Sequence, residues 1–460
     1  MTHVVVVGGG ITGLVAAREA ARSGASVTLV EPGPLGGKVR ASAFDGALLD
    51  EAADNFLARV PEGLVLCREL GLEGDLVSPA VRRARVWSRG ELRLLPEAQL
   101  LGVPTDLDEL AASEILSPAG TDRARQDLTM PSTAPDADVT IGSVVRTRLG
   151  DEALERLVDP LVGGINAGDT DVLSLAATVP QLDAAVRSGQ SSLIEACRAQ
   201  RAAVTDPTAP VFFAPRSGMG ALVDALVTDV TARGVSIVQN AVAEMGRDGL
   251  AWRVELADRT SLPAEGVVLT LPAAPAADLL RHHAARAATL LASIPYASVA
   301  MISLAVPRDA IERELDASGF LVPHVEGRTV SACSWTSAKW PHLASDGSVW
   351  LRASVGRDGH EGALALSDEA LVDATLADLR HTMALRGAPT EARVTRWHRS
   401  LPQYRPGHLD RIAAIDDDLA TALPGVVVAG AALRGLGVPA CIRQGSEAAW
   451  RVLGVLDARP

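Results

Sequence analysis

The chain has 460 residues and is 48% hydrophobic, so it can bury a large core and form more than one domain. Its formal net charge of -13 disfavours a nucleic-acid partner, and an anionic substrate would need a local cluster of Arg or Lys. Cys67, Cys197, Cys333 and Cys441 are widely spaced without a CxxC pair. The sequence therefore predicts neither a metal site nor a redox disulfide.

The first segments of the chain have the pattern of one β-α-β unit. His3–Val7 is an apolar run typical of a buried parallel strand, and the glycine-rich turn Gly8–Gly13 follows it. Leu14–Ser23 is rich in alanine and predicts a helix. Val27–Val30 predicts a second strand, which ends at Glu31.

Gly8, Gly10 and Gly13 have the spacing of a dinucleotide fingerprint, in the required place between a strand and a helix. The first glycine permits a tight turn, the second lets a pyrophosphate approach the backbone, and the third lets the helix pack closely on the sheet. Glu31 follows at the distance expected of an acid that accepts hydrogen bonds from ribose hydroxyls. A glycine-rich turn that binds nothing is the alternative.

Gly36-Gly37-Lys38 follows Glu31 closely. Two glycines and a cation at this place can supply a second contact to the cofactor, which a plain nicotinamide-binding domain does not need. This segment therefore favours FAD over NAD, with an ordinary loop as the alternative reading.

The middle of the chain changes character twice. Residues 64–203 are mostly helical in pattern, alternation of helix and strand returns from Val211, and residues 296–355 are rich in strand patterns. The uncharged stretch Ala287–Pro307 is long enough to span a membrane, but Pro295 interrupts it. We expect it to be a helix end followed by a buried strand. The N-terminus leads directly into a strand without a signal segment, so a cytoplasmic protein is expected, peripheral to a membrane at most.

The end of the chain repeats the strand-turn-helix pattern of its beginning. Val426–Ala429 predicts a buried strand, and the glycine-rich turn at Gly435–Val438 leads to a helix over Pro439–Leu453. In a flavoenzyme the N-terminus of such a helix can face the pyrimidine edge of the isoalloxazine, where negative charge develops on reduction. A simple connection between strand and helix is the alternative.

Five stretches together carry a resemblance that covers nearly the whole chain. They are Val4–Gly13 with Leu35–Arg40, Asp54–Arg59, Arg148–Asp169, Trp397–His408 and Gly437–Gly445. The chain resembles the FAD-dependent protoporphyrinogen/coproporphyrinogen oxidases of bacterial haem synthesis, which belong to the wider amine-oxidase-like flavoprotein group.

The layout and the resemblance imply an α/β fold. A Rossmann-type FAD-binding domain is expected to be assembled from residues 1–85, 206–290 and 396–460. A helical middle domain is expected over 86–205. A strand-rich, mixed α+β substrate domain is expected over 291–395.

The resemblance also implies the activity. The enzyme would oxidise coproporphyrinogen III to coproporphyrin III in successive two-electron steps, with FAD as cofactor, molecular oxygen as acceptor and hydrogen peroxide as product. Transient contact with a downstream haem-synthesis enzyme is a further expectation. The alternatives are oxidation of protoporphyrinogen IX, another oxidase of the amine-oxidase type acting on an amine or a polyene, and a non-catalytic relative.

The resemblance assigns residues to FAD and to the substrate. The expected FAD contacts are Gly8, Gly9, Gly10, Ile11, Thr12, Gly13, Glu31, Pro32, Gly37, Lys38, Ala52, Ala53, Asp54, Asn55, Val242, Trp397, Gly430, Gly435, Leu436, Gly437 and Val438. The expected substrate contacts are Arg59, Gly163, Gly164 and Asn166. Arg146 and Arg148 join Arg59 as candidates to pair with propionates, because Arg suits bidentate carboxylate contacts. A solvated surface charge is the alternative for each of the three.

No catalytic base and no metal are assigned. Pyrrole N–H protons can leave to water, so the chemistry has no obligatory base, and His398 and His408 are interpreted as structural hydrogen-bonding residues. The chain departs from the family at Ala52 and Ser217, where glycine is usual, and at Asn166, where an aromatic residue is common. If the family's glycine at position 52 needs a positive φ, either Ala52 is strained or the loop has moved.

Overall fold

The computed structural model describes residues 2–131, 134–203, 206, 209–249, 251–343 and 347–457. The chain forms two compact units, the first made of Met1–Ser78, Pro210–Pro295 and Leu409–Pro460, and the second of Pro79–Ala209 and Tyr296–His408. The predicted division into three domains stays a prediction. Residues 396–408 fall in the second unit, and the predicted boundary at residue 205 lies outside the described residues.

A parallel sheet is the centre of the first unit. Its strands follow the order β12-β2-β1-β16-β22 and every neighbouring pair is parallel. In that order they span Ser236–Val238, Ser26–Val30, His3–Val7, Gly266–Leu269 and Val426–Val428. The side chains of Val4, Val5 and Val6 are fully buried, as an apolar run in a sheet covered on both faces requires. The predicted α/β fold is confirmed.

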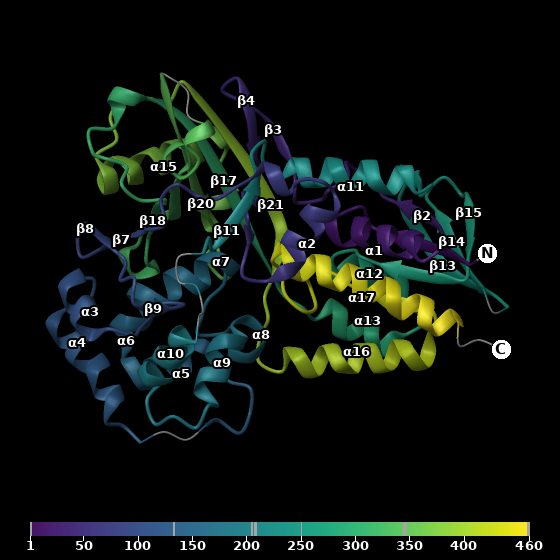
Figure 1. The fold of residues 1–460 in the computed structure, drawn as a ribbon, viewed down its shortest axis with the longest axis horizontal. Helices are drawn as coiled ribbons and strands as arrows, with labels where there is room; N and C mark the ends of the chain where they lie inside the picture. The colour runs from purple at the N-terminus through teal and green to yellow at the C-terminus, as the bar shows by residue number, and fades with distance from the viewer. Residues whose placement is uncertain are drawn as a thin grey trace. The chain divides into compact units, whose positions relative to one another are not determined.

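Three long helices pack with this sheet: α1 (Ile11–Arg22), α11 (Gly220–Ala232) and α17 (Val438–Asp457). Figure 1 shows α17, in yellow, running alongside α1, in purple, although they come from opposite ends of the chain. A Cβ built on Gly445 would lie 2.5 Å from the carbonyl oxygen of Thr12. The glycine thus allows the close approach of α17 to α1, and the domain is built from both chain ends as predicted.

Smaller elements complete the first unit. Its other helices are α2 (Pro61–Glu69), α12 (Ala273–Leu280), α13 (Ala285–Ala292) and α16 (His408–Ala422). Its other strands are β3 (Ala41–Phe44), β4 (Ala47–Asp50), β5 (Phe56–Leu57), β6 (Leu76–Val77), β11 (Phe212–Pro215), β13 (Val242–Asp248), β14 (Ala251–Leu256) and β15 (Ser261–Ala264).

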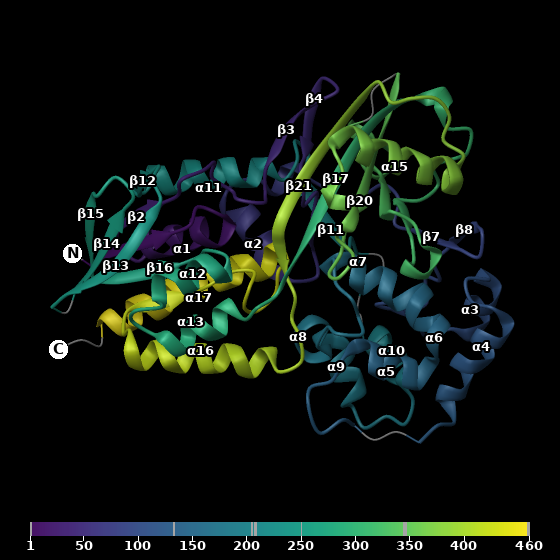
Figure 2. The same ribbon diagram turned by 180° about the vertical axis from the view of Figure 1, so that it is seen from behind.

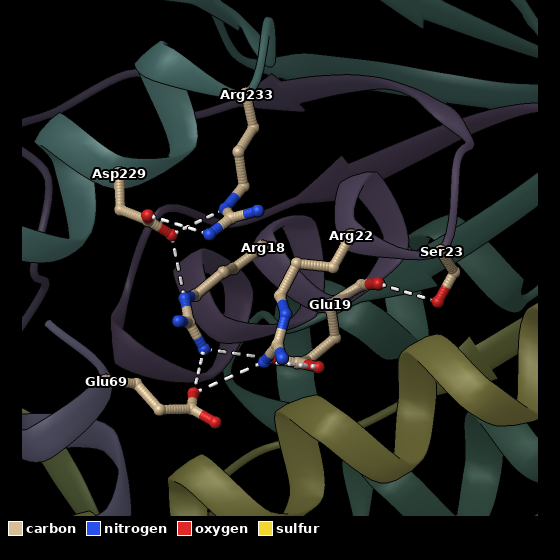
Figure 3. A network of polar contacts seen from close by, with 7 residues as sticks. All are labelled: Arg18, Glu19, Arg22, Ser23, Glu69, Asp229 and Arg233. Carbon is tan, nitrogen blue, oxygen red and sulfur yellow. Dashed lines mark hydrogen bonds and ion pairs between the residues drawn. The ribbon is translucent and has the colours of Figure 1, made fainter.

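A network of charged side chains joins α1, α2 and α11 (Figure 3). Arg18, only 2% exposed, donates through Nε to Asp229 at 2.8 Å and through Nη1 to Glu69 at 2.6 Å. Arg233 also donates to Asp229, and Arg22 also donates to Glu69. Each buried charge therefore has a partner, as burial demands.

A mixed sheet is the centre of the second unit (Figure 2). Its strands follow the order β21-β17-β20-β19-β18-β7-β8. In that order they span Glu391–Pro402, Tyr296–Pro307, Ser348–Val355, Val330–Trp335, Gly319–Leu321, Arg85–Ser88 and Glu91–Leu94. The last two strands lie in the stretch predicted as mostly helical. That prediction is wrong there, because Val86 and Trp87 are buried as members of this sheet.

Helices form the rest of the second unit. They include α3 (Leu107–Ser113), α4 (Pro118–Arg125), α5 (Ile141–Leu149), α6 (Asp151–Ala153), α7 (Gly164–Asn166), α8 (Leu175–Thr178), α9 (Pro180–Val186), α10 (Leu193–Ala202), α14 (Thr336–Lys339) and α15 (Asp368–Met383). A π-helix, η3, spans Leu154–Gly163 and contains Pro160. Short strands β9 (Gln99–Leu100) and β10 (Val103–Pro104) pair beside them.

The uncharged stretch Ala287–Pro307 contains the end of α13 and the whole of β17, as predicted. Ala300, Ile302 and Leu304 on β17 are fully buried. Among the described residues, no helix combines the length and the apolar character needed to cross a membrane.

Candidate functional site

The glycine turn after β1 has the geometry that its spacing predicted. Gly8 has a φ of +107°, a value that side chains other than glycine rarely adopt. A Cβ on Gly13 would lie 1.8 Å from the carbonyl oxygen of Gly8, so only glycine lets α1 begin so close to the strand. Thr270, at the end of β16, donates through Oγ1 to the carbonyl oxygen of Gly8 at 2.9 Å. The turn is therefore fixed from both sides.

The space over Gly10 is open. A Cβ built on this residue would meet no heavy atom within 4 Å. Gly10 is the N-cap of α1 and gives the helix no side-chain cap. The N–H groups of the first helical turn have no partners within the helix, and they carry the positive end of the helix dipole. The arrangement can accept a phosphate against the backbone.

Glu31 stands at the end of β2 and is tied to the same turn. Its Oε2 accepts a hydrogen bond from the backbone N–H of Gly9 at 2.7 Å, and its Oε1 accepts one from Gly33 at 2.9 Å. Each carboxylate oxygen has a further lone pair for a ribose hydroxyl. The acid is thus held beside the phosphate position.

Gly36-Gly37-Lys38 returns to the glycine turn. Gly36 donates its N–H to the carbonyl oxygen of Gly9 at 2.8 Å, and a Cβ on Gly37 would lie 3.3 Å from Cα of Gly10. Burial lowers the pKa of the Lys38 ammonium. Burial also raises the pKa of the Cys441 thiol, and the nearby Lys38 charge opposes that shift. These two residues bring the segment to the first turn of α17.

The C-terminal turn presents the N-terminus of α17 to the same region. Gly435 has a φ of +105°, and its carbonyl oxygen accepts a hydrogen bond from Nε2 of Gln444 at 3.1 Å. The N–H of Cys441 donates to the carbonyl oxygen of Gly437 at 3.0 Å, which closes the first helical turn. Both helix N-termini of the site, those of α1 and α17, therefore belong to the first unit.

The two departures from glycine cause no backbone strain. In the described chain neither Ala52 nor Ser217 has a positive φ. The chain near Ser217 is held by Asp50, which is buried and accepts two hydrogen bonds from the N–H of Met219, at 2.9 and 3.0 Å. Of the two outcomes expected at position 52, backbone strain is excluded, because Ala52 has an ordinary φ.

Other predicted cofactor residues are spread over both units. Pro32 is exposed, the segment Ala52–Asn55 forms a half-buried loop, and Val242 lies where the pairing of β13 with β14 shifts register. Trp397 lies on β21 in the second unit, opposite Val299. Their contacts with a cofactor stay predictions.

Two of the three arginine candidates for the substrate are occupied by the protein itself. Arg148 is buried and paired with Asp127, and it also donates to the carbonyl oxygens of Pro131 and Ser191. Arg146 is paired with Asp151, Glu155 and Asp171. These contacts support a structural role for Arg148 and Arg146, and their pairing with propionates stays a prediction. Arg59 is exposed, and within the described chain it makes no ion pair.

The predicted substrate-lining turn lies at the end of η3. Gly163 and Gly164 lead to Ile165, whose side chain is 63% exposed. Asn166 is buried, and its Nδ2 donates to the carbonyl oxygen of Val162 at 2.8 Å. Ile165 therefore presents its side chain at this turn, and Asn166 stabilises it from within.

His408 is fully buried, and its ring stacks on that of Tyr404 with centroids 4.1 Å apart. Its role as a structural hydrogen-bonding residue stays a prediction. His398 is exposed on β21.

Comparison with known proteins agrees with this geometry. The sequence pattern of the flavin containing amine oxidoreductases matches residues 11–453. The chain belongs to this family. It is 37% identical to coproporphyrinogen III oxidase of Propionibacterium freudenreichii, over 100% of this chain and 92% of that protein. It is 34% identical to coproporphyrinogen III oxidase of Bacillus subtilis, over 97% of each chain. The crystal structure of a putative protoporphyrinogen oxidase from Exiguobacterium is 30% identical, with a TM-score of 0.87 over 99% of each chain.

Members of this flavin oxidoreductase family carry a flavin, and the residues of the first unit fit one. The open space over Gly10 and the uncapped N-terminus of α1 suit its phosphate. Glu31 suits a ribose, and the N-terminus of α17 suits a group that gains negative charge. A flavin is therefore the cofactor of this flavin oxidoreductase.

Sequence reasoning missed two residues that shape the site of this flavin oxidoreductase. Thr270 fixes the glycine turn, and Asp50 holds the start of α11. Thr270 directly follows β16 of the parallel sheet, and residues at the carboxyl ends of such strands gather near the ligand. This position at the end of a parallel strand is the sequence signal that could have identified Thr270. No sequence signal identifies Asp50.

Proposed function

We propose that the chain binds FAD and oxidises coproporphyrinogen III to coproporphyrin III, with molecular oxygen as acceptor and hydrogen peroxide as product. The observation that carries this proposal is the near-complete match to relatives named coproporphyrinogen III oxidase, at 34% and 37% identity. The intact dinucleotide cradle at Gly8–Gly13 and Glu31 supports it.

The cofactor supplies the redox chemistry, because a bound flavin can accept a hydride and return electrons to oxygen. The protein's own residues bind and orient. The N–H groups at the start of α1 hold the pyrophosphate, and Glu31 holds a ribose through its carboxylate. The N-terminus of α17 stabilises negative charge through its dipole.

Arg59 is the proposed partner for a propionate of the substrate. It is exposed and free of an ion pair in the described chain, so its guanidinium can form a bidentate contact with a carboxylate. Gly163 and Gly164 are also proposed to contact the substrate. The reacting C–H group lies next to a pyrrole and is an activated hydride donor, and the pyrrole N–H proton can leave to water. We therefore assign no catalytic base.

Protoporphyrinogen IX is the second candidate substrate, because the Exiguobacterium structure carries the name putative protoporphyrinogen oxidase. The two substrates differ in how many carboxylates they present. The test incubates purified holoenzyme with each porphyrinogen in air and follows porphyrin fluorescence together with hydrogen peroxide. We expect coproporphyrinogen III to react faster. Faster reaction of protoporphyrinogen IX would overturn the substrate assignment, and reaction of neither by FAD-loaded enzyme would overturn the function.

A further inference from the structure

The turn Gly163–Asn166 is held by a set of long-range contacts within the second unit. Asp159, on η3, accepts two parallel hydrogen bonds from Arg357, which follows β20: Nη1 to Oδ2 at 2.7 Å and Nη2 to Oδ1 at 2.8 Å. Thr170 donates through Oγ1 to the same Asp159 carboxylate at 2.8 Å. The Asp159 and Arg357 side chains are only 10% and 15% exposed.

This ion pair lies directly against the turn. A Cβ built on Gly163 would lie 2.9 Å from Oδ1 of Asp159 and 3.4 Å from Nη2 of Arg357. The N–H of Asp358, next in the chain, donates to the carbonyl oxygen of Ala167 at 2.8 Å. Arg357 and its neighbour therefore hold both ends of the turn.

A second contact secures the opposite side of the turn. Gln403 is fully buried, and its Nε2 donates to the carbonyl oxygen of Asn166 at 2.9 Å. Ala167, at the end of the turn, has a φ of +44°, in the left-handed region that a residue with a Cβ rarely adopts. Such a conformation persists when surrounding contacts impose it.

The held turn presents an exposed apolar side chain, and the residue that follows the turn packs in a cluster with a predicted cofactor contact. Ile165 is 63% exposed, whereas Ala167 packs in a buried cluster with Ala297 and Val299, against which Trp397 also packs. Figure 2 shows α7, which contains Ile165, near the ends of the long strands of this unit.

We propose that Arg357 is a positioning residue, which holds the turn Gly163–Asn166 in the conformation that meets the substrate. This inference rests on the proposed function. Arg357 acts through Asp159 and does not itself take part in the reaction. A guanidinium suits the role because its planar fork fixes the carboxylate in two places, whereas the ammonium of lysine makes a single point contact.

The test compares Arg357→Lys with Arg85→Lys in the holoenzyme. Arg85 is a matched control: it makes a two-point contact with Asp316 in the same unit, at 3.0 and 2.6 Å, and its guanidinium otherwise donates to the carbonyl oxygen of Leu92. We expect R357K to raise KM for coproporphyrinogen III about tenfold with a smaller change in kcat, because small misplacements of binding groups are costly. R85K should leave KM unchanged.

The double variant Asp159→Asn with Arg357→Gln removes both charges and keeps hydrogen-bonding amides. We expect it to recover thermal stability and normal flavin content while KM stays raised. Wild-type KM in R357K, or a KM that recovers together with stability in the double variant, would overturn the inference.

Hydrogen exchange of the backbone amides of residues 163–170 separates this inference from the proposed function. We expect faster exchange there in R357K than in the wild type or R85K. If the wild-type enzyme oxidises no porphyrinogen, the proposed function fails, and the exchange result alone decides the role of Arg357. Unchanged exchange would contradict that role.

Discussion

The carboxylate of Glu31 accepts a hydrogen bond from the backbone N–H of Gly9 at 2.7 Å, across 22 residues of sequence. This contact joins the acid at the end of β2 to the glycine turn after β1. The ribose-binding group and the phosphate-binding turn are therefore positioned together, before any cofactor binds.

Replacing Glu31 by Gln should weaken flavin binding. The amide keeps the shape of the side chain but removes its charge, and its single acceptor oxygen cannot serve the N–H groups of both Gly9 and Gly33. We expect the Kd for FAD to rise about tenfold, which corresponds to about 1.4 kcal/mol. Fluorescence titration of the apoprotein with FAD measures this. Glu265→Gln is the control, because Glu265 accepts from the N–H of His3 at the other end of β1. An equal effect of both variants would contradict a ribose role for Glu31.

Gly10→Ala should separate cofactor binding from folding. The new Cβ meets no protein atom within 4 Å, so the apoprotein should keep its thermal stability. The same Cβ occupies the phosphate position, so the Kd for FAD should rise more than about tenfold. Gly454→Ala is the control, because a Cβ at this position inside α17 also meets no heavy atom within 4 Å. It should lower neither the thermal stability of the apoprotein nor its affinity for FAD. Normal FAD binding by G10A would place the phosphate elsewhere.

Gly13→Ala should instead prevent correct folding of the first unit. Its Cβ would lie 1.8 Å from the carbonyl oxygen of Gly8 and 2.7 Å from Oγ1 of Thr270. Because the carbonyl oxygen of Gly8 belongs to the backbone and cannot rotate out of the way as a side chain can, α1 would have to move away from β1. We expect little soluble protein, or a strongly lowered Tm in thermal unfolding. A stable G13A protein would show that the turn can rearrange.

The Arg18 network should contribute to stability in a pH-dependent way. Arg18→Met removes hydrogen bonds to three carboxylates, those of Glu19, Glu69 and Asp229. It should lower the free energy of unfolding by about 1.5–3 kcal/mol, the range for hydrogen bonds to charged groups. Arg22→Met is the matched control. Its side chain is 39% exposed, so its loss should cost about 0–1 kcal/mol.

The sign of the pH dependence follows from Asp229. Hydrogen bonds from Arg233 and from Arg18 lower the pKa of this carboxyl. The stabilisation is therefore present above the pKa of the unfolded chain and is lost as pH falls through the folded value. Denaturant unfolding over an acid pH series measures the free energy of unfolding of the wild type and of R18M. The difference between the two free energies should become smaller as pH falls. A difference that grows on acidification would contradict the network.

Features that depend on local spacing could be predicted from the sequence. Features that depend on contacts between residues far apart in the chain could not. Gly8, Gly10 and Gly13 act within one turn, so their spacing was sufficient. Asp50 and Met219 are 169 residues apart, and no local pattern links them.

Charge alone was equally insufficient for the substrate site. Arg148 looked available in sequence, but the fold buries it against Asp127. No sequence pattern marks Arg357, because its partner Asp159 lies 198 residues away. The strand β7 was missed because its pairing with β18 is also long-range.

His324 should report on the charge of Arg357. Its ring lies 3.9 Å, centroid to centroid, from that of His360. Burial, followed by the His360 and Arg357 charges, lowers the pKa of His324, while Asp159 and Asp169 oppose this shift. In Arg357→Gln the pKa of His324 should rise, since a neighbouring positive charge is gone. Titration of the imidazole by NMR measures this, with R85K as control. An unchanged or lower pKa would contradict the arrangement.

The most direct test of the central claim mixes FAD-loaded enzyme with coproporphyrinogen III in the absence of oxygen, and then admits air. We predict that the visible flavin absorbance is lost on mixing. It should return with oxygen, as coproporphyrin III and hydrogen peroxide appear. A flavin spectrum that coproporphyrinogen III leaves unchanged, but that an amine or protoporphyrinogen IX bleaches, would contradict the account.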